Sequence, residues 1–61
     1  MSIIEHSETN YSIIEADDGD ASALAARVDT WLNTGSWLCA GGLVVKQNGN
    51  IAQALIKKTL I

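Results

Sequence analysis

One stretch of the sequence decides the fold, and it reads Gly35-Ser36-Trp37-Leu38-Cys39-Ala40-Gly41-Gly42-Leu43-Val44-Val45. Gly35 can adopt the left-handed backbone conformation that ends a helix. The apolar residues that follow it are typical of a strand. Gly41 and Gly42 interrupt this strand, and paired glycines there indicate either a bulge or the close approach of another backbone or a ligand. We favour the bulge, because no phosphate-binding glycine spacing surrounds the pair.

The segment before Gly35 predicts a single amphipathic helix that runs from Ala21 to about residue 34. Leu24, Val28 and Leu32 recur every four residues and form one apolar stripe. The carboxylate of Asp20 can accept hydrogen bonds from the free N–H groups of the first helical turn. We therefore expect the helix to begin after Asp20 and to lay its apolar stripe on a sheet.

Two more strands are predicted, over residues 10–16 and 50–58, from their aromatic and β-branched content and their alternation. Asn48-Gly49 lies between the second and third strands and predicts a two-residue hairpin turn. Residues 1–9 show no sustained period. We expect them to form an N-terminal tail outside the core that packs on a sheet edge or adds to it.

The order of these elements predicts an α+β fold of the β-α-β-β type for residues 10–61, which form a single domain. We expect a three-stranded antiparallel sheet with the third strand in the centre and the helix across one face. The strands carry apolar residues on both faces, whereas one helix covers only one face. Because an uncovered apolar face promotes aggregation, we expect a second copy to bury it, in a homodimer or a homotetramer.

The length of the chain supports the same expectation. A chain of 61 residues buries only about 60% of the surface that its unfolded form exposes, so its stability alone is marginal. Cys39 is the only cysteine and His6 the only histidine. Neither an intrachain disulfide nor a zinc site of cysteine and histidine ligands can therefore form within one chain. We expect no metal and no cofactor, and association as the stabilising device.

The charge of the chain limits its partners. Seven acidic and four basic residues give a net charge of −3, which disfavours binding to nucleic acid and to an anionic membrane surface. The apolar runs are far shorter than the roughly 20 residues of a membrane-spanning helix, and no basic segment precedes an apolar stretch as in a secretory signal. We therefore expect a cytoplasmic protein, in a bacterium or in an infected host cell.

The residue types do not predict catalysis. Cys39 needs a neighbouring base to form a thiolate, and His6 lies in the predicted tail. Asp17, Asp18 and Asp20 lack the ligand spacing of a calcium loop. Gln53 is a polar residue on an apolar strand face, and two interpretations remain open: it hydrogen-bonds main chain at the glycine bulge, or it faces a ligand cleft.

Two groups of residues are candidates for binding. Those expected to contact a small polar ligand or a protein partner are Trp37, Gly41, Gly42, Lys46 and Gln53. Those expected at an interface between copies of the chain are Trp31, Trp37, Leu43, Val45, Leu55, Leu60 and Ile61.

Several of these motifs resemble, in order and spacing, the domain-of-unknown-function family numbered seventeen-thirty-seven, which consists of short bacterial and phage proteins. The matching motifs are Tyr11 to Glu15, the Leu24/Val28/Leu32 helix, Gly35-Ser36-Trp37-Leu38, Gly41 to Val45, Gly49 and Gln53 to Lys57. Here Ser36 separates Gly35 from Trp37, which are often adjacent in the family. The resemblance covers residues 10–58 and implies an α+β fold and a phage or prophage origin; it supplies no catalytic residues.

The function expected from these observations is a non-enzymatic, homo-oligomeric binding or interaction protein. The alternative is a viral protein, encoded by a phage, that counters host defence. Such a protein would inhibit a host protein or sequester a small nucleotide signal.

Overall fold

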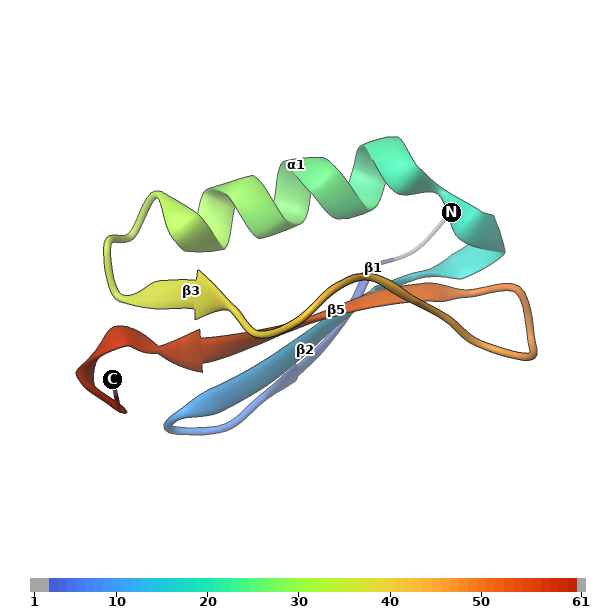
Figure 1. The fold of residues 1–61 in the computed structure, drawn as a ribbon. Coiled ribbons are helices and arrows are strands. Elements are labelled where there is room, and N and C mark those ends of the chain that lie inside the picture. Colours follow the sequence, from blue (N-terminus) through green and yellow to red (C-terminus); the bar gives the residue numbers. More distant parts are fainter. Residues whose placement is uncertain (1–2, 61) are drawn as a thin grey trace.

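The structure is a computed structural model that describes residues 3–60, and it places one helix over one face of an antiparallel sheet (Figure 1). The predicted α+β class is confirmed. The strands and the helix are β1 (Ile3–Ser7), β2 (Tyr11–Ala16), α1 (Ala21–Leu32), β3 (Trp37–Cys39), β4 (Val44–Val45) and β5 (Ile51–Lys57). Single 3-10 turns follow β2, over Asp17–Gly19, and β5, over Lys58–Leu60.

The strand order is β1-β2-β5-β3, and β4 pairs with β5 beyond β3. The last strand therefore lies in the centre, as predicted, because it pairs with β2 on one side and with β3 and β4 on the other. The prediction of three strands is wrong, since the sheet has five. One additional strand is formed by the expected tail, which adds to the sheet edge, one of the two arrangements expected for it; its Ile3 packs against the core, contrary to the expectation that the tail lies outside it. The other additional strand arises because a bulge divides the predicted second strand.

The additional edge strand β1 pairs with β2 along its whole length. Glu5 connects this strand to the helix: its Oε2 accepts a hydrogen bond from Trp31 Nε1 at 2.8 Å and lies 3.1 Å from Arg27 Nη1. The hydrogen bond from Trp31, together with the smaller effect of Arg27, lowers the pKa of Glu5 from its ordinary value although partial burial opposes this. These long-range contacts order a segment that carries few apolar residues of its own.

Helix α1 begins where the sequence predicts, because Asp20 Oδ1 accepts from the backbone N–H of Ala23 at 3.0 Å. It ends at Leu32, two residues earlier than predicted. Beyond this point the helical i→i−4 bonding is replaced: the carbonyl of Trp31 accepts the hydroxyl of Thr34 at 2.7 Å and its backbone N–H at 3.2 Å. Gly35 follows with a φ of +82°, in the left-handed region that the sequence analysis assigned to it.

The hydrophobic core lies between the helix and the sheet. Its buried members are Ile14, Ala16, Leu24, Trp37, Ile51 and Leu55, and Ile3, Val28, Trp31 and Leu32 pack against them. The two tryptophans meet edge to face, with ring centroids 5.1 Å apart and an interplanar angle of 76°. Such a pair adds about 0.5–1.5 kcal/mol beyond the burial of its area and fixes the corner after the helix.

The glycine pair forms the predicted bulge. Ala40 N–H donates to Ala54 at 2.9 Å and Val44 pairs with Ala52, so residues 41–43 lie opposite Gln53 alone. Two extra residues preserve the alternation of side chains, so β4 continues the pattern of β3. Gly41 has a φ of +81°, which a residue with a side chain adopts only with strain.

The hairpin between β4 and β5 is one residue longer than predicted. Lys46 N–H donates to the carbonyl of Asn50 at 2.8 Å, so the loop contains the three residues 47–49. Gly49 has a φ of +89°, and the Asn48 side chain accepts the Asn50 N–H at 3.0 Å. An Asn-Gly pair also suits this longer turn, in which glycine occupies the left-handed position.

Candidate functional site

The two faces of the sheet each carry a hollow, and both hollows contain residues named as candidates from the sequence. We call the first the open-face hollow. It lies on the face without the helix, has a volume of about 730 Å³ and is lined by His6, Tyr11, Ile13, Glu15, Ala40, Gly41, Gly42, Val44, Lys46, Ala52 and Ala54. Small residues of β5 and of the bulge make up much of this lining, which explains why the surface is depressed there.

The polar end of the open-face hollow is formed by Glu15, which is only 5% exposed. Asn50 Nδ2 donates to its Oε2 at 2.6 Å, and Lys46 Nζ lies 3.1 Å from each of its oxygens. His6 Nε2 lies 3.5 Å from Oε1. The hydrogen bond from Asn50, and after it the one from Lys46, lowers the pKa of Glu15 against the opposing effect of burial.

These contacts change the interpretation of Lys46. Lys46 is predicted from the sequence to contact a small polar ligand or a protein partner, whereas its ammonium is paired with the Glu15 carboxylate inside the chain. Sequence reasoning missed the cluster of Glu15, Lys46 and Asn50. The available signal was Glu15 itself, a charged residue next to Ile14 in a strand with an isoleucine on each face.

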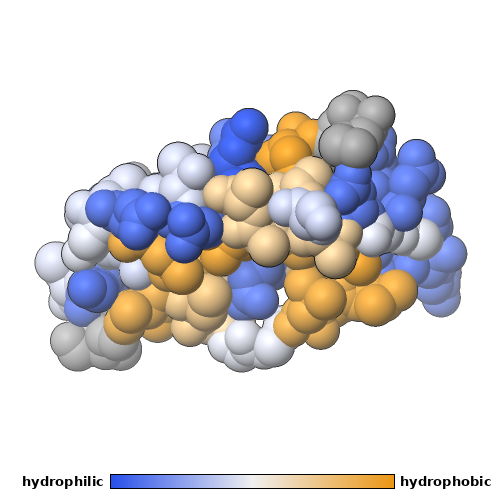
Figure 2. Space-filling model, turned by 90° about the horizontal axis from the view of Figure 1, so that it is seen from above, coloured by the Kyte–Doolittle hydropathy of each residue, from blue (hydrophilic) through white to orange (hydrophobic). Residues whose placement is uncertain are grey.

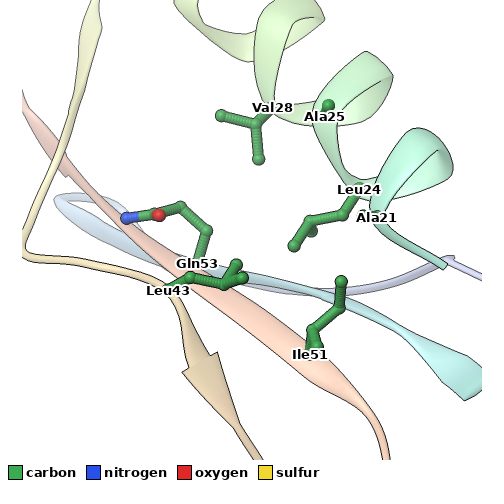
Figure 3. Close-up of a pocket in the computed structure, with 7 residues that line it drawn as sticks. All are labelled: Ala21, Leu24, Ala25, Val28, Leu43, Ile51 and Gln53. Carbon is green, nitrogen blue, oxygen red and sulfur yellow. The ribbon is translucent and has the colours of Figure 1, made fainter. Parts of the chain in front are cut away.

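The second hollow, which we call the helix-side cleft, lies between α1 and the bulge (Figure 3). It has a volume of about 230 Å³ and is lined by Ala21, Leu24, Ala25, Val28, Leu43, Ile51 and Gln53. Six of the seven lining residues are apolar, so Gln53 supplies the only side-chain polar group.

The structure confirms the first of the two interpretations of Gln53, a hydrogen bond to main chain at the glycine bulge. Its Nε2 donates to the carbonyl of Gly41 at 3.1 Å, within the bulge, and to the carbonyl of Ala54 at 2.9 Å. The same side chain lines the helix-side cleft. The candidates Gly41 and Gly42, in contrast, line the open-face hollow, so the residues expected to form one ligand site are divided between the two faces of the sheet.

Trp37 is separate from both hollows. It is buried in the core, and Lys57 Nζ lies 5.1 Å from the centroid of its ring. Among the residues expected at an interface, Leu55 is 0% exposed within the chain itself and Trp31 is half-buried against the core. A second copy cannot reach Leu55 while the helix stays in place.

The two exposed candidates for an interface, Leu43 and Val45, flank Val44 and lie on the helix side of the sheet, since Leu43 lines the helix-side cleft and Val45 pairs with Ile51. Leu43 is 54% and Val45 is 71% exposed, and the residue between them, Val44, is 57% exposed. Figure 2, which looks down on the helix, shows hydrophobic surface in orange along the lower edge of the molecule. Ile61 lies outside the described residues, as does the side chain of Leu60.

The described residues do not bring a nucleophile and a base together. Cys39 is exposed on β3, opposite Leu55 and therefore on the helix side, whereas His6 lies on the other face at the far edge strand β1. Within residues 3–60, no three side chains of histidine, cysteine, aspartate or glutamate gather into a metal-binding group. In the same part of the chain, no helix has the length and apolar character that crossing a membrane requires.

Comparison of the chain with protein-family models, with curated proteins and with solved structures found no match. The resemblance to the small family of bacterial and phage proteins therefore stays a prediction from the sequence motifs.

Proposed function

We propose that this chain is a non-enzymatic interaction protein that associates with a second copy of itself through the helix-free face of its sheet. The observation that carries the proposal is the position of α1, which covers one face and leaves the other open (Figure 1). The register places apolar residues from every strand on that open face. They are Ile4, Tyr11, Ile13, Leu38, Ala40, Val44, Ala52, Ala54 and Ile56.

The open face belongs to a chain that is otherwise packed normally. The accessible surface is 3803 Å², and a compact monomer of this mass exposes roughly 3800 Å². The apolar face is therefore a formed surface and not the result of loose packing. A standard interface buries about 800 Å² per partner, roughly a fifth of this total, which is within what one face of such a domain can supply.

The charges of the molecule also favour contact at this face. The chain carries a net charge of −3, so two copies repel each other wherever their acidic residues meet. Glu15 is the only acidic residue that lines the open-face hollow, and Lys46 neutralises it there. Asp20 and Asp29 belong to the cap and the body of α1, and Glu5 pairs with the helix, away from the open face.

The geometry suits stacking of sheet on sheet. Two sheets pack face to face at about 10 Å, with the side chains of both inner faces interdigitated. Tyr11 is half-exposed on this face, and an aromatic residue of that kind is a common anchor of interfaces. The small side chains of Ala52 and Ala54 leave room for larger side chains of a second copy.

Sedimentation equilibrium of the wild-type chain and two variants tests the proposal. We expect the wild type to sediment at twice its 6.5 kDa mass or a higher multiple at micromolar concentration. Ala54→Glu and Tyr11→Glu each place an unpaired charge on the open face and should yield monomers. Ala26→Glu makes the same change as Ala54→Glu on an exposed helix position and should leave the assembly intact.

Circular dichroism of each variant establishes that it is folded before its mass is interpreted. A folded wild-type monomer at micromolar concentration contradicts the proposal. So does an assembly that survives both open-face variants while they retain their helix and sheet signals.

A further inference from the structure

The helix-side cleft exists because the sheet-facing side chains of α1 differ in size along its length. Near its start the helix presents Ala21 and Ala25 to the cleft, whereas its last turn packs Trp31 and Leu32 against the core. The small side chains cannot fill the space above β5 that the large ones fill further along. The resulting space of about 230 Å³ is open to solvent, since Ala21, Ala25 and Leu43 on its rim are exposed.

Gln53 occupies a position in the cleft where an apolar residue would be expected. Its neighbours on the same face of β5, Ile51 and Leu55, are both buried in the core. Placing a carboxamide there lowers stability unless its polar atoms are hydrogen-bonded. Both Nε2 protons are used, in the bonds to Gly41 and Ala54.

These two bonds fix the orientation of the carboxamide. Both partners are backbone carbonyl groups, which accept hydrogen bonds and cannot donate them, so the amide cannot be turned over. The oxygen Oε1 of Gln53 is then the remaining polar atom of the side chain. No described residue donates a hydrogen bond to it, and it is not buried from solvent.

We infer that the helix-side cleft binds a small apolar molecule with one N–H or O–H donor, and that Gln53 Oε1 accepts the hydrogen bond from that donor. An apolar hollow with one fixed polar group is the usual construction of a small-molecule site. Benzene fills an enclosed cavity of about 150 Å³. The cleft is open to solvent and has a volume of about 230 Å³, so a bicyclic ring of the size of indole fits it with part of the ring at the surface.

The lining also determines which ligands are excluded. None of the seven residues carries a charge, so a phosphate or a carboxylate would lose its hydration without gaining a cation. The site therefore does not suit a nucleotide. The cleft lies on the opposite face of the sheet from the proposed contact between copies. The proposed ligand site and the proposed association can therefore be tested, and fail, independently.

Titration with indole, followed by nuclear magnetic resonance, tests the inference. We expect saturable shifts of the methyl groups of Leu24, Val28, Leu43 and Ile51 and of the Gln53 side-chain amide. The matched probe is 1-methylindole, which has nearly the same apolar body and no N–H. One hydrogen bond changes affinity by about three- to tenfold, so 1-methylindole should bind more weakly by that factor.

Three variants of the chain locate the site. Ala25→Phe fills the cleft and should weaken indole binding more than tenfold, whereas Ala26→Phe, at an exposed neighbouring position outside the lining, should leave it unchanged. Gln53→Met keeps the length of the side chain and removes its carbonyl group. It should abolish the preference for indole over 1-methylindole.

Four results would overturn the inference. These are the absence of saturable shifts up to the solubility of indole, equal affinities for the two probes, unchanged binding by folded Ala25→Phe, and contacts in the free protein between the cleft methyl groups and another part of this chain or a second copy. The mass of the assembly, measured on the same samples, reports on the proposed function independently.

Discussion

The face of the sheet beneath α1 and the face away from it receive alternate residues of the same strands. On β5, Ile51 and Leu55 lie beneath the helix and are buried, whereas Ala54 and Ile56 on the other face stay half-exposed. The residues on the two faces of β5 are similarly apolar, so their composition does not cause the difference in burial. The helix covers one face, and the connection between β2 and β3 is long enough for only one such helix.

A polar residue with apolar neighbours on its strand lies on each face, Gln53 on one and Glu15 on the other, and the hydrogen-bonding groups of the two are satisfied differently. Gln53 beneath the helix bonds main chain of its own sheet and leaves an oxygen without a partner among residues 3–60. Glu15 on the open face is surrounded by Asn50, Lys46 and His6. The free oxygen of Gln53 supports the proposed ligand site beneath the helix, and the neutralised charge of Glu15 supports the proposed contact between copies on the open face.

The largest expected effect comes from deleting a side chain under the helix. Leu55→Ala removes a fully buried core residue, and such changes reduce the free energy of unfolding by about 2–5 kcal/mol. A domain of this length has little more than that in total, so the variant should be largely unfolded at room temperature. Urea titration followed by circular dichroism measures the effect.

The matched change on the open face is Ile13→Ala. In dilute, monomeric protein it should reduce stability much less than Leu55→Ala, because Ile13 is only half-buried. If copies associate through this face, the loss should grow with protein concentration, as mass action requires. If Ile13→Ala reduces the free energy of unfolding as much as Leu55→Ala at every protein concentration, the two faces do not differ in how deeply they are buried in the monomer, and the prediction is wrong.

An intermediate effect is expected at the bulge, where one chain segment borders both faces. Gly41→Ala places a side chain at a φ of +81° and should reduce the free energy of unfolding by about 1–2 kcal/mol. Gly42→Ala is the control, since its φ lies outside the left-handed region and no atom lies within 4 Å of an added Cβ. Thermal unfolding of both variants should show a lower midpoint for Gly41→Ala alone; equal midpoints would contradict this account of the bulge.

The smallest effect at neutral pH is expected from Glu15→Gln, which keeps the shape of the side chain. The folded state lowers the pKa of Glu15 below its ordinary value of 4.5, so the unfolded state takes up a proton first as the pH falls. The carboxylate therefore stabilises the fold above about pH 4.5, and this contribution is lost as the pH falls through the folded pKa. The wild type should exceed Glu15→Gln in stability by a constant amount above that pH, and the difference should narrow below it.

Urea titrations over a series of pH values measure this difference. Glu8→Gln, at the exposed turn between β1 and β2, controls for the loss of one negative charge. If the difference in the free energy of unfolding between wild type and Glu15→Gln widens on acidification, the fold does not stabilise the charged form of Glu15, and the prediction is wrong.

Much of the fold could be predicted from local patterns. The cap at Asp20, the stop at Gly35 and the bulge at Gly41 each depend on residues within a few positions of one another, and the structure has all three. The central place of the last strand followed from the order of elements. These features could be read from the sequence because their physical causes act over short stretches of chain.

The errors concern features that depend on distant residues. The sequence left open whether the first nine residues pack on a sheet edge or add to it, since Ile3 and Ile4 alone are a weak signal and the partners of Glu5 are more than 20 residues away. The cluster around Glu15 was missed for the same reason: Lys46 and Asn50 are 31 and 35 residues from it. Leu55 was expected at an interface because alternation along the strand shows which residues share a face with it. Alternation does not show which of the two faces the helix covers.

The sequence by itself determined the local elements of this protein: where the helix begins, which glycine follows its end, where the sheet bends and which residues share a strand face. Only the tertiary structure decided how those faces are used. In the folded chain Gln53 lines a cleft, and the carboxylate of Glu15 pairs with the ammonium of Lys46. One apolar face of the sheet is not covered by the helix. The physical reason is that capping, turns and alternation act between neighbours in the chain, whereas burial and ion pairing depend on which distant segments the fold brings together.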